Sequence, residues 1–187
     1  MMEKINNFVM PFLPPEAKLR LMFADEASFG RISEPAYCWC PAGIRPTVPC
    51  HRVREYVYAF GAVDPVYGDS QFIIAPNCNT AWMSEFLKVL SAAYPNDYLL
   101  VCLDNAGWHK AKALFIPHNI TLFYLPPYTP EMNVIEPIWK EVRNDGFKNT
   151  LFNSLSDVVD RLATSLISLS QNAILSICSR KWIQSIL

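Results

Sequence analysis

Three acidic residues give the clearest chemical signal in this 187-residue chain: Asp25, Asp104 and Glu136. Asp25 and Asp104 each follow a short apolar run that predicts a β-strand. Glu136 falls in the first turn of a predicted helix, where Pro137 is tolerated. Ligands of open α/β sheets bind at the carboxyl ends of the strands. If the two strands are parallel neighbours, both aspartates lie at that edge, and the helix returns Glu136 beside them.

Carboxylates that cluster in this way repel one another unless a cation compensates their charge. Mg²⁺ is a hard ion that proteins hold with one or two carboxylates together with phosphate oxygens of a substrate. Two such ions about 4 Å apart activate a nucleophile and stabilise the leaving oxygen of a phosphoryl displacement. In this arrangement Asp25 would bridge both ions, while Asp104 and Glu136 would hold one each.

Each acid also has an ordinary structural interpretation. Asp25 and Glu26 suit a solvated turn after a strand. Asp104 and Asn105 suit an Asx turn or a helix cap, and Glu136 suits the positive end of a helix dipole. Spacing alone leaves both interpretations open.

The elements that must position these residues follow from the apolar periodicity. Strands are predicted over residues 19–24, 54–62, 71–75, 98–103 and 120–124, and helices over 79–93, 108–115, from after 130 to about 147, and from 155 to near the C-terminus. The first three strands form a meander, and the later ones alternate with helices. The order predicts an α/β fold with a mixed sheet, antiparallel on one side and built from parallel β-α-β units on the other, flanked by helices.

The length suits one domain, and 51% apolar residues exclude a disordered tail. We expect a lead-in segment over 1–18, the main domain over 19–150, and a C-terminal helix over 151–187 that packs on the same domain. The longest uncharged run, 162–179, is too polar to span a bilayer, and no N-terminal stretch is typical of a signal peptide. We therefore expect a cytoplasmic protein without a membrane partner. Sixteen Lys and Arg against 17 Asp and Glu argue against nucleic-acid binding by charge alone.

Free thiols are the default expectation for the six cysteines, because a chain of this length without a secretory signal needs no disulfides. Cys102 lies in an apolar run and is expected in the core. Cys38, Cys40, Cys50 and His51 offer four zinc ligands in principle. Paired ligands of structural zinc sites are usually spaced by about two to four residues, so zinc is the less favoured interpretation.

Three segments resemble the catalytic domain of DDE transposases, in particular the bacterial insertion-sequence branch of the mariner-like superfamily. They are FADEASFG at 23–30, LVCLDNAGWHKAKAL at 100–114 and LPPYTPEMNVIEPIWKEVR at 125–143. Thr129, Met132 and Val134 stand where the family pattern has serine, leucine and proline, and none of these changes removes a metal ligand. Residues 39–43 also resemble a W-x-P-x-G turn of this group, and the match covers about residues 19–147.

The resemblance implies a ribonuclease H-like fold for the domain at 19–150, with two Mg²⁺ or Mn²⁺ ions as cofactors. It assigns the catalytic and metal-binding roles to Asp25, Asp104 and Glu136. The implied chemistry is nicking of DNA at transposon ends, then attack of the freed 3′-hydroxyl on target DNA, without a covalent protein–DNA intermediate. The implied partner is DNA, both transposon ends and target, in a bacterial cell beside the nucleoid.

Three further residues are secondary candidates for the site. Glu26 could help to position a metal ion, although a solvated glutamate is the commoner case. Asn105 could orient Asp104 by hydrogen bonding or merely close the turn. His109 matches the family histidine and could contact phosphate or metal-bound water, or only pack at a helix start.

Basic and aromatic residues near these motifs have less specific interpretations. Arg52, Arg54, Lys110 and Lys112 could touch DNA phosphates, although scattered basic residues usually form a solvated face. Trp139 is expected in the core rather than as a platform for base stacking.

Family members carry helix-turn-helix modules ahead of the catalytic domain, and only 24 residues precede Asp25 here. We therefore expect the N-terminal part on a longer or separate product, and weak, salt-sensitive DNA binding by this chain. In relatives the loop corresponding to residues 28–52 can reach a partner subunit, which suggests a homodimer. Two other functions stay open: a different ribonuclease H-like nuclease or resolvase, and an inactive remnant that serves as a DNA-associated or dimerisation module.

Overall fold

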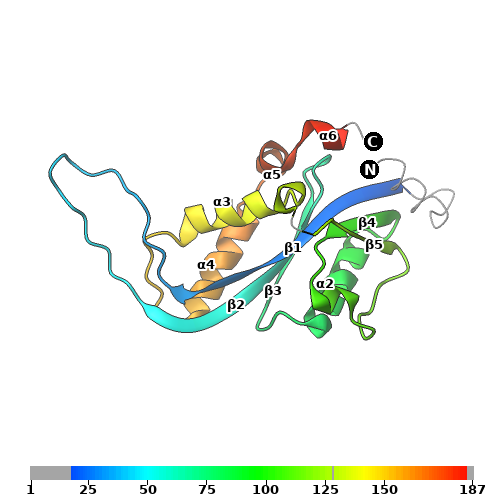
Figure 1. Cartoon of the computed structure of the whole chain (residues 1–187), viewed down its shortest axis with the longest axis horizontal. Coiled ribbons are helices and arrows are strands. Elements are labelled where there is room, and N and C mark those ends of the chain that lie inside the picture. The colour runs from blue at the N-terminus through cyan, green and yellow to red at the C-terminus, as the bar shows by residue number, and fades with distance from the viewer. Residues whose placement is uncertain (1–17, 128, 185–187) are drawn as a thin grey trace.

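A five-stranded sheet forms the centre of the computed structural model, which describes residues 18–127 and 129–184 (Figure 1). The strands are β1 (Lys18–Ile32), β2 (Arg52–Val63), β3 (Ser70–Ala75), β4 (Asp97–Leu103) and β5 (Ile120–Tyr124), in the spatial order β3-β2-β1-β4-β5. β1, β2 and β3 pair antiparallel, whereas β4 is parallel to both β1 and β5. The predicted mixed sheet is therefore confirmed. The predicted lead-in segment lies outside the described residues, apart from its last residue.

Strand β1 is much longer than predicted and does not end before Asp25. Its parallel pairing with β4 stops at Phe23, opposite Cys102, but its antiparallel pairing with β2 continues as far as Ile32. The residues after Asp25 keep the alternation of a strand, with Ala27 and Phe29 buried and the intervening serine exposed. Asp25 thus lies inside β1, two residues after the last pair that β1 forms with β4. This places it at the carboxyl edge of the parallel strands, as predicted.

Alternate residues of β1 and β4 face opposite sides of the sheet and pack in two separate apolar layers. Met22, Ala24 and Leu99 pack with helix α2 (Thr80–Ala93), which the Asn79 side chain caps. Leu21 and Phe23, on the opposite face, pack with residues of the later helices. These are α3 (Glu136–Gly146), α4 (Leu155–Ile167), α5 (Gln171–Cys178) and α6 (Lys181–Gln184). Figure 1 shows α2 on one side of the sheet and α3 to α5 on the other, so helices cover both faces.

Two predicted helices were wrong in extent. The segment 108–115 forms only a 3₁₀ turn, η1 (Gly107–Lys110), followed by turns. The C-terminal part is three helices instead of one. The Ser170 side chain accepts a hydrogen bond from the backbone N–H of Ala173, and such a cap starts a new helix where the old one could have continued. In the part of the chain that the structure describes, none of the helices combines the length and apolar character needed to cross a membrane.

A long loop between β1 and β2, residues 33–51, extends away from the body of the molecule (Figure 1). We call it the projecting loop. Its base is closed by a hydrogen bond from the Ser33 N–H to the His51 carbonyl at 3.0 Å. The Asn149 side chain forms hydrogen bonds with both the N–H and the carbonyl of Ala36. The backbone of Asn149 is left-handed, with a φ of 56°. Farther along the loop, the Trp39 side chain is fully exposed.

The cysteines of the projecting loop, Cys38, Cys40 and Cys50, are exposed free thiols. Among residues 18–127 and 129–184, no three His, Cys, Asp or Glu side chains lie close enough together to hold one metal ion. The structure therefore does not assemble the zinc site that was considered for this segment. Cys102 is buried in the core, as expected from its apolar run.

A buried ionic cluster stabilises the end of the sheet opposite Asp25 and Asp104. The Arg20 guanidinium bonds the carboxylates of Asp64, Asp69 and Asp97 at 2.8, 2.6 and 2.7 Å. These partners stand at the end of β2, before β3 and at the start of β4, so one side chain joins four strands. The cluster fixes the register of β1 against its neighbours, and that register places Asp25.

Candidate active site

Asp25, Asp104 and Glu136 line one cavity of about 390 Å³ at the carboxyl edge of β4. They come from the middle of β1, from the residue after β4, and from the first residue of α3. The rest of the lining comes from the loop after β4 and from the segment that leads from β5 to α3. The structure thus brings the three predicted residues to one cavity, although they are far apart in sequence.

Asp25 is the most deeply set of the three carboxylates. Its Oδ2 accepts a hydrogen bond from the indole Nε1 of Trp139 at 3.0 Å. Burial, together with the negative charges of Glu26 and Asp104, raises the pKa of Asp25 to about 7 despite this hydrogen bond. Trp139 is itself buried in the core, against the rings of Phe29 and Phe72, so its position is rigid. The site therefore favours a cation beside Asp25.

Asp104 is exposed and is held by its own loop and by His109. Its Oδ1 accepts the N–H of Ala106 at 2.9 Å and lies 3.0 Å from Nδ1 of His109. The other ring nitrogen of His109, Nε2, lies 2.8 Å from Oε1 of Glu26. Two secondary candidates, Glu26 and His109, thus form a continuous bridge from β1 to the end of β4.

His109 is buried, and burial by itself disfavours its charged form. The hydrogen bond to Glu26 and the charges of Glu26 and Asp104 outweigh burial and raise the pKa of His109. The hydroxyl of Tyr124 donates to the His109 carbonyl at 2.7 Å, which anchors η1 against β5. This arrangement favours the bridging imidazolium that holds the Asp104 carboxylate.

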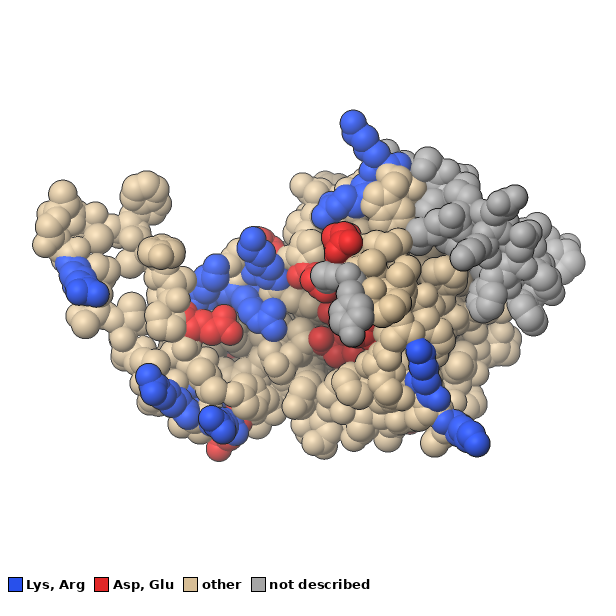
Figure 2. Space-filling model, in the orientation of Figure 1, with Lys and Arg blue, Asp and Glu red and all other residues tan. Residues whose placement is uncertain are grey.

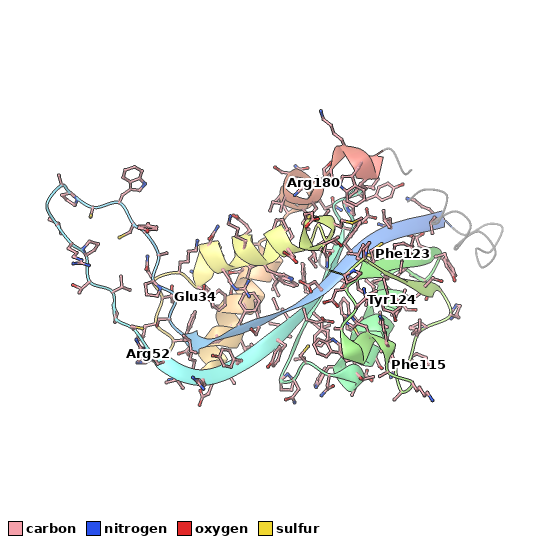
Figure 3. All side chains as sticks on the ribbon, in the orientation of Figure 1. Glu34, Arg52, Phe115, Phe123, Tyr124 and Arg180 are labelled. Atoms are coloured by element: carbon pink, nitrogen blue, oxygen red, sulfur yellow. The ribbon has the colours of Figure 1, made fainter. Side chains whose placement is uncertain are left out.

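The third secondary candidate, Asn105, closes the loop. Its Nδ2 donates to the Leu125 carbonyl at 2.6 Å and thereby ties the loop after β4 to the end of β5. Asn105 also lines the cavity, so it sets the position of Asp104 through the backbone. Of the basic candidates, Lys110 lies in η1 over the ring of Tyr124, at 5.1 Å from its centroid. Arg52 is the first residue of β2 and lies at the base of the projecting loop (Figure 3).

Glu136 begins α3, with Pro137 directly after it, as predicted. Its side chain is exposed, and partial burial of the carboxyl together with the charge of Glu131 raises its pKa. The position of Glu136 depends on Asn133, which sequence reasoning missed. The backbone carbonyl of Asn133 accepts a hydrogen bond from the Glu136 N–H at 3.3 Å. The side-chain Nδ2 of Asn133 donates to the Ala24 carbonyl at 3.0 Å.

Asn133 therefore couples the start of α3 to β1, one residue before Asp25. It is buried, it lines the cavity, and within the described residues its Oδ1 has no hydrogen-bond partner. Asn133 does not stand at the capping position of α3, which is Ile135 and makes no side-chain cap, so no local capping signal singled it out. Its long-range partner on β1 is 109 residues away and could not be read from the sequence.

Carboxylate oxygens around one cavity are the donor set that Mg²⁺ and Mn²⁺ prefer. Because no three potential ligands stand within reach of one ion in the described residues, the carboxylates surround the cavity without closing on a single point. Like charges repel one another unless a cation compensates them. The residues present fit a hard divalent ion by their chemistry.

Comparison with known proteins identifies the family of this chain. Residues 20–159 match the family model described as DDE superfamily endonuclease. The uncharacterized protein y4pE/y4sA of Sinorhizobium fredii (strain NBRC 101917 / NGR234) is 34% identical over 130 residues, which cover 68% of this chain and 96% of that protein.

Solved structures of Mos1 transposase share the fold. The paired-end complex with the left transposon end has a TM-score of 0.65 at 13% identity, covering 95% of this chain and 55% of that chain. A pre-cleavage Mos1 transpososome has a TM-score of 0.66 at 14% identity, covering 94% and 55%. This chain spans about half the length of those proteins. The sheet has the predicted ribonuclease H-like fold, and the chain belongs to the DDE superfamily of endonucleases.

Proposed function

We propose that this chain is the catalytic core of a transposase, which cuts DNA at transposon ends and joins the freed ends to target DNA. The observation that carries the proposal is the convergence of Asp25, Asp104 and Glu136 on one cavity from three separate elements. The family match supports an endonuclease, and the similar Mos1 structures are complexes with a transposon end.

The three carboxylates are assigned as ligands of two Mg²⁺ or Mn²⁺ ions, in keeping with Mos1 complexes that were crystallised with Mn and with Mg. When bound, the ions supply Lewis-acid activation of the attacking oxygen and stabilisation of the leaving oxygen. The protein itself orients the ligands. Trp139 fixes Asp25, the Glu26–His109 bridge fixes Asp104, and Asn133 sets the helix start that carries Glu136.

In the first reaction, the oxygen of a water molecule forms a bond to the scissile phosphorus, and the bond from phosphorus to O3′ breaks. The departing O3′ takes a proton and becomes a free hydroxyl. In the second reaction that hydroxyl loses its proton as its oxygen bonds to a phosphorus of the target strand, and the bond from that phosphorus to the target O3′ breaks, so that the displaced O3′ takes up a proton. Both steps are direct displacements, so the protein needs no nucleophilic side chain, and acidic ligands suffice.

Strand transfer separates this proposal from a simple nuclease or resolvase. The assay incubates the chain with Mn²⁺, supercoiled plasmid and a labelled duplex that carries a pre-exposed 3′-hydroxyl. Label joined to the plasmid is expected with the wild-type chain and with Asp160→Ala, an exposed acid of α4, and no joining with Asp104→Ala. Nicking without joining would assign a nuclease, and neither product would favour a non-enzymatic module.

The proposal extends to the assembly. We assign a homodimer in which the projecting loop contacts the second copy, because Tyr37 and Trp39 are fully exposed there. We also assign recognition of the transposon end to helix-turn-helix modules on a longer or separate product. We assign the protein to the bacterial cytoplasm, beside the nucleoid. Sedimentation should give a dimer that Trp39→Ser weakens; an unchanged assembly would exclude the loop as the contact.

A further inference from the structure

A second hollow, of about 510 Å³, adjoins the acid cavity and shares Asn133 and Glu136 with it. Its lining includes two cations from different parts of the chain, Lys140 of α3 and Arg180 of the turn between α5 and α6. The remaining lining comes from Glu131, Val134 and Pro137. A hollow with basic side chains beside a carboxylate site has the chemistry to hold an anion there.

Two backbone carbonyls of its own turn hold Arg180 in place. Its Nη1 donates to the carbonyls of Ile177 and Ser179 at 2.8 and 2.9 Å, which leaves other guanidinium donors available. The turn that carries it is anchored on both sides by the buried Cys178 and Ile183. Figure 3 shows Arg180 beside the first turn of α3, and it lies outside the residues 20–159 that match the family model.

Lys140 stands one turn after Glu136 on α3. Residues four apart share a helix face and are separated by about 6 Å along the axis. Neither Lys140 nor Arg180 has a carboxylate within 4.0 Å in the described part of the chain, and both side chains line the hollow. On this face Lys and Arg side chains gather next to the acidic ones (Figure 2).

Two negative charges, Glu131 and Glu136, face the same hollow and oppose an anion. A divalent ion held by Glu136, as in the proposed function, would remove part of that opposition. Along a DNA strand successive phosphates advance by about 3.4 Å per nucleotide. A hollow that begins at Glu136 and reaches Lys140 therefore has the right extent for a phosphate one or two nucleotides from the scissile one.

We propose that Lys140 and Arg180 form a subsite for a backbone phosphate of the DNA strand being cut. The inference rests on the proposed function and deepens it, because it assigns to the C-terminal helices a direct part in substrate binding. Phosphate contacts position DNA without reading its sequence, so the subsite acts on any duplex.

The test measures the affinity of the chain for a fluorescent duplex as salt is raised, with Ca²⁺ present to compensate the carboxylates. Lys140→Gln and Arg180→Gln should each reduce the slope of log affinity against log salt by about 0.9. Each should also weaken binding about fivefold. Arg180→Lys keeps the charge and should keep the slope. Lys88→Gln is the matched control, because Lys88 lies on α2 and pairs with Glu85.

Slopes for Lys140→Gln and Arg180→Gln equal to that of Lys88→Gln would overturn the subsite. Arg180 also bonds backbone carbonyls, so melting temperatures check that its variant is folded; Lys140, exposed on α3, gives the independent reading. If the wild-type chain joins DNA ends but these slopes do not change, only the subsite fails. If the wild-type chain binds no duplex at all, the proposed function fails with it.

Discussion

Replacing Asp25 by asparagine should stabilise the metal-free protein at alkaline pH and leave its stability nearly unchanged in acid. Burial and the charges of Glu26 and Asp104 raise the pKa of Asp25 from 3.8 to about 7. Between these two values the folded protein holds a proton that the unfolded chain releases, so stability falls as the pH rises. Asparagine has the same shape, still accepts the Trp139 N–H, and carries no charge to desolvate.

The magnitude follows from the shift in the pKa of Asp25. One pKa unit corresponds to about 1.36 kcal/mol. Between pH 5 and pH 8, the folded carboxyl loses its proton while the unfolded one is already ionised, which corresponds to about 2 to 3 kcal/mol. The wild-type protein should lose this free energy of unfolding relative to Asp25→Asn across that range, and the loss should end above the raised pKa.

The assay is urea denaturation of both proteins at a series of pH values with a chelator present, so that no divalent ion offsets the charge. Other titrating groups are common to both proteins and largely cancel in the difference. A difference in unfolding free energy that grows by about 2 kcal/mol or more from pH 5 to pH 8 is expected. A difference that stays flat would show that Asp25 ionises normally and would refute the description of its environment.

Three structural predictions test the frame that holds the site. Arg20→Met leaves three aspartates without their cation and should lower the free energy of unfolding by about 3 to 5 kcal/mol in urea denaturation. A decrease of less than about 1 kcal/mol would contradict the buried cluster. Gly61→Ala places a methyl 2.7 Å from the Trp139 ring and should cost about 1 to 3 kcal/mol, whereas Gly107→Ala, with nothing within 4 Å, should be near neutral; equal costs would contradict this packing. Asn149→Gly keeps the left-handed backbone but loses two hydrogen bonds at the base of the projecting loop, so proteolysis there should accelerate about tenfold, and an unchanged rate would oppose this anchoring.

Local patterns sufficed to predict the elements that carry Asp104 and Glu136. The continuous apolar run of β4 marks a strand buried on both faces, and a proline directly after Glu136 marks a helix start. The extent of β1 was harder to predict, because Asp25 and Glu26 interrupt its apolar run. The alternation that resumes at Ala27 and Phe29 was the signal for continuation.

The contacts that orient the carboxylates could not be predicted, because their partners are remote in sequence. Glu26 and His109 are 83 residues apart, and Trp139 is 114 residues from Asp25. The C-terminal helix was predicted to be continuous because apolar spacing persists through the serines near residue 170. Ser170 caps a new helix there, and this break is what brings Arg180 to the hollow beside Glu136.

Mn²⁺ binding, followed by electron paramagnetic resonance as the ion is titrated into the chain, measures whether the three carboxylates hold a divalent ion together. Asp25→Asn, Asp104→Asn and Glu136→Gln should each weaken binding sharply, because all three carboxylates line one cavity. Asp160→Asn, which removes an exposed acid of α4, should bind as the wild type does. Binding that is unaffected by Glu136→Gln, or that falls equally in Asp160→Asn, would contradict a shared metal site at this cavity.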